Sequence, residues 1–203
     1  MRPLTTIAAL ITLGASLFAA APVPRPAKEL EIAEPNGKHD LLTNYKGKVV
    51  VVQFLFTTCP HCQAYSQLLT KLQNEYGPKG FQALGAAFNE ADNNMVSNYI
   101  NQYKVGFPIG PVQRETVLSF LGFQLTDRLV VPQIALIDRK GIIREQTEAN
   151  PSGPAPLQDE AHLRAAIQRL LAEGAPAKGA ASKAPSGAAK TPSGTAKKPV
   201  SRN

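Results

Sequence analysis

The feature that most constrains this chain is a long apolar run that leads directly into its only two cysteines. Lys48–Phe56 contains four consecutive valines, followed by Phe54, Leu55 and Phe56. A β-branched and aromatic run of this length is typical of a strand that is buried on both faces. Such strands belong to sheets that helices cover on both sides, so the run predicts an α/β fold.

The segments around this run support the same fold class. Helically spaced leucines follow Cys59-Pro60 and stop at Gly77-Pro78, and Phe81–Phe88 predicts a second buried strand. The other elements we expect are a hairpin of Glu29–Ile32 and His39–Leu42 around Asn36-Gly37, a short extended piece at Phe107–Ile109, strands at Ile134–Asp138 and Gly141–Gln146, a loop at Thr147–Pro156, and helices at Asn94–Tyr103, Glu115–Leu121 and Asp159–Glu173. This order predicts one α/β domain over residues 29–173.

Residues 1–21 have the pattern of an export signal. Arg2 gives a short positive start, no charge follows as far as Ala21, and three small alanines end the segment. Left uncleaved, it is borderline in length for an anchor, because a bilayer takes roughly 17–25 residues. Either as a signal peptide or as a short anchor, it places the domain in the periplasm or another extracytoplasmic compartment, where disulfides persist. The proline-rich residues 22–28 predict a stiff linker.

The net charge of +7 does not belong to the predicted domain. Six of the positive charges lie in residues 174–203 and one is Arg2, so residues 3–173 are neutral. A basic nucleic-acid-binding domain is therefore excluded. The segment 174–203 is almost entirely Ala, Pro, Ser, Gly, Lys and Thr, which predicts a disordered tail. Its charges allow a weak, salt-sensitive attachment to an envelope or membrane surface.

The two cysteines form the motif Cys59-Pro60-His61-Cys62 at the expected start of a helix. Free amides at a helix N-terminus stabilise an anion and so favour the thiolate of Cys59. Pro60 suits the first turn because it lacks an N–H that would be unsatisfied there. Cys62 lies about one turn on and more buried. We therefore expect Cys59 to attack a disulfide, Cys62 to resolve the mixed disulfide, and His61 to stabilise the thiolate further.

Val131-Pro132 stands directly before an apolar strand, where proline is tolerated only at special positions. Beside a Cys-x-x-Cys pair, we expect this proline to be cis and to shape a substrate groove. Glu90 follows the second buried strand and is a candidate proton relay for Cys62.

Two other kinds of site remain as alternatives. A metal site would need ligands beyond the cysteines, and only His39 and His162 remain, so no metal is expected. A copper-binding assembly factor like the Sco proteins would carry a wider cysteine spacing and a distant His ligand. A peroxidase resembling this fold would need Thr three residues before the reactive cysteine, where this chain has Phe56. Disulfide exchange requires no cofactor, because the disulfide itself carries the two electrons.

Together with Gly47-Lys48 and Ile137-Asp138-Arg139-Lys140-Gly141, these motifs resemble the exported, redoxin-like thioredoxin-fold proteins of the TlpA/ResA type over residues 29–173. The resemblance implies a thioredoxin-like domain, with a central mixed sheet flanked by helices, an N-terminal β-hairpin extension and an inserted strand and helix. It implies a protein disulfide oxidoreductase whose partners are protein thiols and disulfides of the cell envelope and an upstream dithiol donor or acceptor. It also implies that Pro132 is cis and that the backbone of Val131 pairs with an extended substrate.

The direction of electron flow has two readings. The resemblance favours a reductase of envelope proteins, of the kind that serves cytochrome c or copper-centre assembly. The dipeptide Pro60-His61 is that of DsbA-type oxidases, and Val131 before the proline also resembles DsbA. A DsbA-like dithiol oxidase is therefore the alternative within this class, and a copper-binding assembly factor without redox turnover is the alternative outside it.

Overall fold

The computed structural model describes residues 21–173, and strand β4 (Val49–Leu55) lies at the centre of its fold. Every residue of β4 is buried, and alternate side chains enter two different cores. Val49, Val51 and Leu55 face one core, whereas Val50, Val52 and Phe54 face the other. The period-two alternation of a strand thus explains why the run is apolar on both faces.

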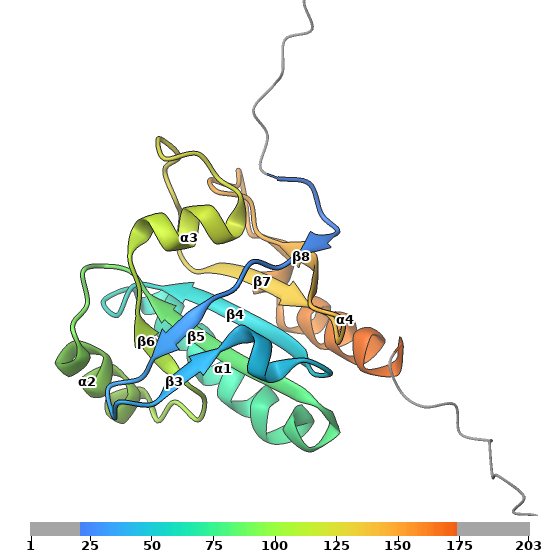
Figure 1. The fold of residues 1–203 in the computed structure, drawn as a ribbon, viewed down its shortest axis with the longest axis horizontal. Helices are drawn as coiled ribbons and strands as arrows, with labels where there is room; N and C mark the ends of the chain where they lie inside the picture. Colours follow the sequence, from blue (N-terminus) through green and yellow to red (C-terminus); the bar gives the residue numbers. More distant parts are fainter. Residues whose placement is uncertain (1–20, 174–203) are drawn as a thin grey trace, which may run out of the picture.

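The main sheet has six strands in the order β1-β8-β7-β4-β5-β6 (Figure 1). The strands are β1 (Arg25–Pro26), β8 (Ile142–Gln146), β7 (Gln133–Ile137), β4, β5 (Phe81–Ala87) and β6 (Ile109–Pro111). β4, β5 and β6 are parallel, whereas β7 is antiparallel to β4, and β8 and β1 continue the antiparallel side. The sheet is therefore mixed, as expected.

Helices cover both faces of this sheet. α1 (Pro60–Tyr76), α2 (Asn93–Tyr103) and α4 (Glu160–Glu173) pack in one core. α3 (Arg114–Leu121) packs in the other core with the hairpin of β2 (Glu31–Ala33) and β3 (His39–Leu41). Figure 1 shows α1 and α4 on one side of the sheet and α3 on the other. Three short 3₁₀ helices complete the described elements: η1 (Leu42–Tyr45), η2 (Gly77–Lys79) and η3 (Pro156–Gln158).

The hairpin extension is held closely against the sheet edge at β6. A Cβ at Gly110 in β6 would collide with the carbonyl oxygen of Ala33 in β2. Glycine is therefore required where these two backbones meet.

The structure confirms the α/β class and the expected element order, and it adds one strand. Arg25–Pro26, within the segment predicted to be a linker, pair with β8 as β1. The Arg25 guanidinium donates to Gln146 Oε1 at 2.6 Å and to the Phe120 carbonyl at 3.1 Å. An open sheet edge presents unpaired backbone groups, and β1 satisfies some of those on β8.

The other predictions at the chain ends concern residues 1–20 and 174–203, which lie outside the described residues. Among residues 21–173, no helix is both long enough and apolar enough to cross a membrane.

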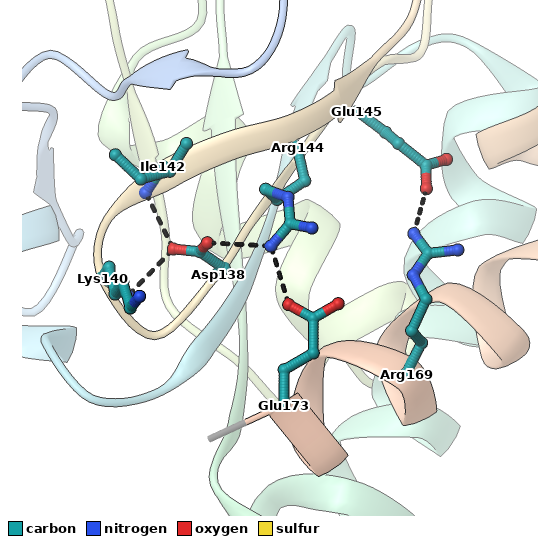
Figure 2. A network of polar contacts seen from close by, with 7 residues as sticks. All are labelled: Asp138, Lys140, Ile142, Arg144, Glu145, Arg169 and Glu173. Carbon is teal, nitrogen blue, oxygen red and sulfur yellow. Dashed lines mark hydrogen bonds and ion pairs between the residues drawn. The ribbon is translucent and has the colours of Figure 1, made fainter.

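A polar network fastens α4 to the β7–β8 hairpin (Figure 2). The Asp138 carboxylate accepts the backbone amides of Lys140 at 2.9 Å and Ile142 at 3.0 Å. Its second oxygen pairs with Arg144 at 3.1 Å, and the same guanidinium nitrogen reaches Glu173 on α4 at 2.8 Å. Burial by itself would raise the pKa of the Asp138 carboxyl, but the two amides and Arg144 together hold it below its usual value.

We predict that Asp138→Ala lowers the free energy of unfolding by about 1–3 kcal/mol near neutral pH, because hydrogen bonds to a charged group are lost. A carboxyl with a lowered pKa stabilises the fold above its unfolded-state pKa of about 3.9 and stops doing so as pH falls through the folded-state value. Thermal unfolding should therefore show a lower melting temperature for the variant than for wild type, and this difference should become smaller in acid. Lys140→Ala, which keeps its backbone amide, is the control. If both variants lose the same free energy of unfolding, the Asp138 carboxylate does not stabilise the fold in the way described.

Candidate active site

Cys59 lies in the short connection that follows β4 and is the N-cap of α1. Its backbone is extended (φ −85°, ψ 117°), and its Sγ accepts the backbone N–H of Cys62 at 3.4 Å. Pro60 occupies the first helical turn, where the missing N–H costs nothing. The half-buried Cys59 sulfur is thus the acceptor at a helix N-terminus, the arrangement that stabilises a thiolate.

Cys62 differs from Cys59 in its surroundings. Its side chain is fully buried in the core formed by α1, α2 and α4, and burial raises the pKa of its thiol far above the usual range. One sulfur is therefore accessible at a helix N-terminus and the other is buried and protonated behind it. This asymmetry is what a nucleophile and a resolving thiol require.

The peptide bond between Val131 and Pro132 is cis, which confirms the expectation for this proline. The Cys59 Sγ lies 3.9 Å from the Val131 carbonyl oxygen, so this loop passes directly beside the nucleophile. Two glutamines hold the loop in place. Gln133 Nε2 donates to the Val130 carbonyl at 2.6 Å, and Gln158 Nε2 donates to the Pro132 carbonyl at 3.0 Å.

A cleft of about 710 Å³ opens along the cis-proline loop. His61 and Tyr65 of α1 line one part of it, and Val131 and Pro132 line another. The loop Pro151–Pro154 lines a further part of the cleft; the sequence predicted this segment only as a proline-rich loop. His61 is exposed on the first turn of α1, and of the two residues between the cysteines it is the one that lines this cleft. A smaller hollow of about 280 Å³, lined by Val50 at the start of β4, lies away from the cysteines at the other end of that strand.

Polar side chains that the sequence analysis did not connect lie beneath Cys62. Gln53, at the position in β4 where the apolar run is interrupted, donates to the Cys62 carbonyl at 2.9 Å. Ser66 Oγ donates to Gln53 Oε1 at 2.7 Å and lies 2.8 Å from the Tyr99 hydroxyl. Tyr99 also reaches the Cys62 carbonyl, at 3.1 Å. The only sequence signal was a polar residue within an otherwise apolar strand.

The structure gives the predicted relay residue, Glu90, no hydrogen bond to a described residue. It is exposed, has a positive φ of 55°, and lines a separate hollow with Pro111 and Arg114. Its neighbour Asn89 is the residue that contacts the active-site loop, accepting the Thr57 amide and donating to the Thr57 hydroxyl, both at 3.0 Å. The relay role of Glu90 stays a prediction without a contact that supports it.

The two remaining histidines are paired elsewhere. His39 lies 2.5 Å from a Glu31 oxygen in the hairpin, and His162 lies 2.7 Å from a Glu145 oxygen. Over residues 21–173, no three His, Cys, Asp or Glu side chains form a group able to hold a metal ion. The described part of the chain therefore offers a dithiol and a cleft, and no ligand set that joins His39 or His162 to the cysteines.

Comparisons with known proteins agree with this geometry. The family model described as Redoxin matches residues 19–167. Thiol-disulfide oxidoreductase ResA of Bacillus thuringiensis (strain Al Hakam) is 27% identical over 136 residues, which are 64% of this chain and 75% of that protein. ResA of Geobacillus thermodenitrificans (strain NG80-2) is 25% identical over 152 residues, 71% of this chain and 84% of the relative.

The fold is shared with a solved structure. A thiol:disulfide interchange protein of the thioredoxin family from Chlorobium tepidum TLS superposes with a TM-score of 0.62 at 24% identity. The match covers 75% of this chain and 99% of that one. The α/β fold with its mixed sheet is therefore thioredoxin-like.

The asymmetry between the two thiols leads to a prediction for alkylation. In Cys62→Ser, the remaining Cys59 should react rapidly with iodoacetamide at neutral pH. In Cys59→Ser, the remaining Cys62 should react slower by about tenfold or more, because it is buried and protonated and the thiolate is the reactive form. Mass spectrometry of timed samples measures both rates. Each variant is also alkylated after unfolding, which gives the rate for a fully accessible cysteine. Equal alkylation rates in the two folded variants would show that Cys62 is not shielded.

Proposed function

The chain belongs to the Redoxin family and is a thiol–disulfide oxidoreductase, and we propose that it reduces disulfides of exported proteins through Cys59 and Cys62. The observation that carries this proposal is the half-exposed Cys59 at the helix N-terminus with the buried Cys62 behind it. The substrate class we favour is envelope proteins of the cytochrome c or copper-centre assembly type.

The first step is attack by the Cys59 thiolate on one sulfur of a substrate disulfide. A bond forms between Cys59 Sγ and that sulfur, the substrate S–S bond breaks, and the other substrate sulfur leaves as a thiolate. The amide of Cys62 that donates to Cys59 Sγ supports this step, because it stabilises the thiolate before the attack.

The second step is resolution by Cys62. Its sulfur loses a proton to solvent or to the departing thiolate and attacks Cys59 Sγ, the mixed disulfide breaks, and the substrate leaves with two thiols. The two electrons that the substrate gains are those the dithiol loses, so no cofactor takes part. An upstream dithiol donor then restores the enzyme.

The cleft beside Val131 and Pro132 is the proposed binding place for the substrate. The Val131 carbonyl already lies 3.9 Å from the reactive sulfur, so a strand that pairs with this backbone brings its disulfide to Cys59. An extended segment suits this edge because main-chain pairing is independent of side-chain sequence.

A second candidate direction rests on His61. It is exposed in the first turn between the cysteines, where an imidazole donor stabilises the Cys59 thiolate and with it the reduced enzyme. A stabilised reduced form makes the dithiol an oxidant of its substrates, as in a DsbA-like oxidase.

Export is part of the proposal and rests on the sequence of residues 1–21. We propose that this segment is a signal peptide or short anchor, that the domain works in the periplasm or another extracytoplasmic compartment, and that the basic segment 174–203 contributes at most a weak surface attachment.

The deciding experiment is the reduction potential of the Cys59–Cys62 pair, measured by equilibration with glutathione buffers. We expect about −220 mV or lower, the range of thioredoxin and glutaredoxin. A value of about −120 to −180 mV, as in DsbA and protein disulfide isomerase, would assign the oxidase direction instead. Insulin reduction by wild type and its loss in Cys59→Ser test the exchange itself, and retained activity in that variant would contradict the role of Cys59.

We further predict that His61→Ala lowers the potential by about 30 mV, equivalent to about 1.4 kcal/mol, because it removes the imidazole that we propose to stabilise the Cys59 thiolate. His39→Ala removes an exposed imidazole of the hairpin and should leave the potential unchanged. The same glutathione titration measures both variants. If neither shifts, His61 does not tune the dithiol.

A further inference from the structure

The hydrogen bonds beneath Cys62 join three elements that the chain does not place together. Gln53 comes from β4, Ser66 from α1 and Tyr99 from α2. The first two side chains are fully buried and Tyr99 is 2% exposed. Two of them, Gln53 Nε2 at 2.9 Å and the Tyr99 hydroxyl at 3.1 Å, converge on the carbonyl oxygen of Cys62.

The proton count of this network is fixed by its chemistry. Gln53 Oε1 is an acceptor only, so Ser66 must use its single hydroxyl proton on that 2.7 Å contact. The Tyr99 proton then serves both remaining contacts, 2.8 Å to Ser66 Oγ and 3.1 Å to the Cys62 carbonyl. Tyr99 is therefore the donor that closes the network, and Ser66 aligns it.

We propose that Gln53, Ser66 and Tyr99 are positioning residues for the resolving step, holding the peptide group of Cys62 so that its sulfur meets Cys59. This inference rests on the proposed roles of the two cysteines. The carbonyl of Cys62 accepts hydrogen bonds from Gln53 and Tyr99, while the amide of the same residue donates to Cys59 Sγ at 3.4 Å. Residue 62 is thus fixed at both of its backbone polar atoms.

Resolution is the step that depends on this alignment. The Cys62 sulfur must approach in line with the bond between Cys59 and the substrate. It forms the Cys59–Cys62 bond as that bond breaks, and its proton goes to solvent or to the departing substrate thiolate. Misplacement by about 1 Å can cost up to about a hundredfold in rate for a positioned reaction. The attack on substrate uses the accessible Cys59 and depends on this alignment less.

The network is neutral, which separates it from a proton relay. Its members are an amide and two hydroxyls, and burial raises the pKa of Tyr99 well above its usual range. The titratable groups that face it among the described residues are Cys62, whose carbonyl it binds, Cys59 and the ring of Tyr103, 5.0 Å from that of Tyr99. Positioning, and not proton transfer, is therefore its part in the reaction.

The test separates attack from resolution in the full-length protein. Reduced enzyme is mixed with oxidised glutathione, quenched with acid at set times, and resolved by mass spectrometry into reduced, mixed-disulfide and internal-disulfide forms. For Tyr99→Phe, we expect attack within about twofold of wild type and resolution about threefold to tenfold slower, as the loss of one hydrogen bond implies. The mixed disulfide should accumulate as a result.

Tyr103→Phe is the matched control, because it removes a hydroxyl from the same helix that makes no hydrogen bond to a described residue. It should resolve at the wild-type rate. Ser66→Ala is the second variant and should behave like Tyr99→Phe, because without Ser66 the tyrosine loses its alignment. Melting temperatures confirm that each variant is folded.

Two results would overturn the proposal, and they are distinguishable. If Tyr99→Phe and Ser66→Ala melt lower but resolve as fast as wild type, the network is structural only. If wild type forms neither a mixed disulfide at Cys59 nor the internal Cys59–Cys62 disulfide, the proposed function fails and the inference with it.

Discussion

The contact between the Cys62 amide and the Cys59 sulfur is the interaction on which the rest of the site depends. It exists because Cys59, in the short connection after the fully buried strand β4, is the N-cap of α1, so its sulfur takes the place of an N-cap oxygen. A thiolate at this position needs no metal or cofactor to be stabilised. The surrounding side chains hold this junction between β4 and α1 in one geometry.

The junction is held from three directions by neutral groups. Gln53 and Tyr99 bind the Cys62 carbonyl from the core, and Asn89 binds Thr57 just before the motif. On the open side, Gln158 fixes the Pro132 carbonyl of the neighbouring loop. Amides and hydroxyls suit this purpose, because buried polar groups that are fully paired give direction without the cost of burying a charge.

The placement of charge follows the same logic. Carboxylates and guanidinium groups gather at the edge of the fold, where Asp138, Arg144 and Glu173 tie α4 to the sheet (Figure 2). The cysteines, by contrast, lie among apolar and neutral polar groups. Burial therefore raises the pKa of the Cys62 thiol with no Lys or Arg side chain among the causes acting on it to lower that pKa again, and the difference between the two thiols is preserved.

The sequence by itself determined the α/β class, the element order, the roles proposed for Cys59 and Cys62 and the special position of Pro132, because these follow from local periodicity, capping chemistry and adjacent residues. Only the tertiary structure decided that Gln53, Ser66 and Tyr99 meet, that residues 151–154 wall the cleft, and that Arg25–Pro26 join the sheet. Ser66 and Tyr99 are 33 positions apart, and Pro132 and Gln158 are 26 apart. Such distant pairs produce no repeating pattern in the sequence, because they form only when separate helices, strands and loops pack on a common core.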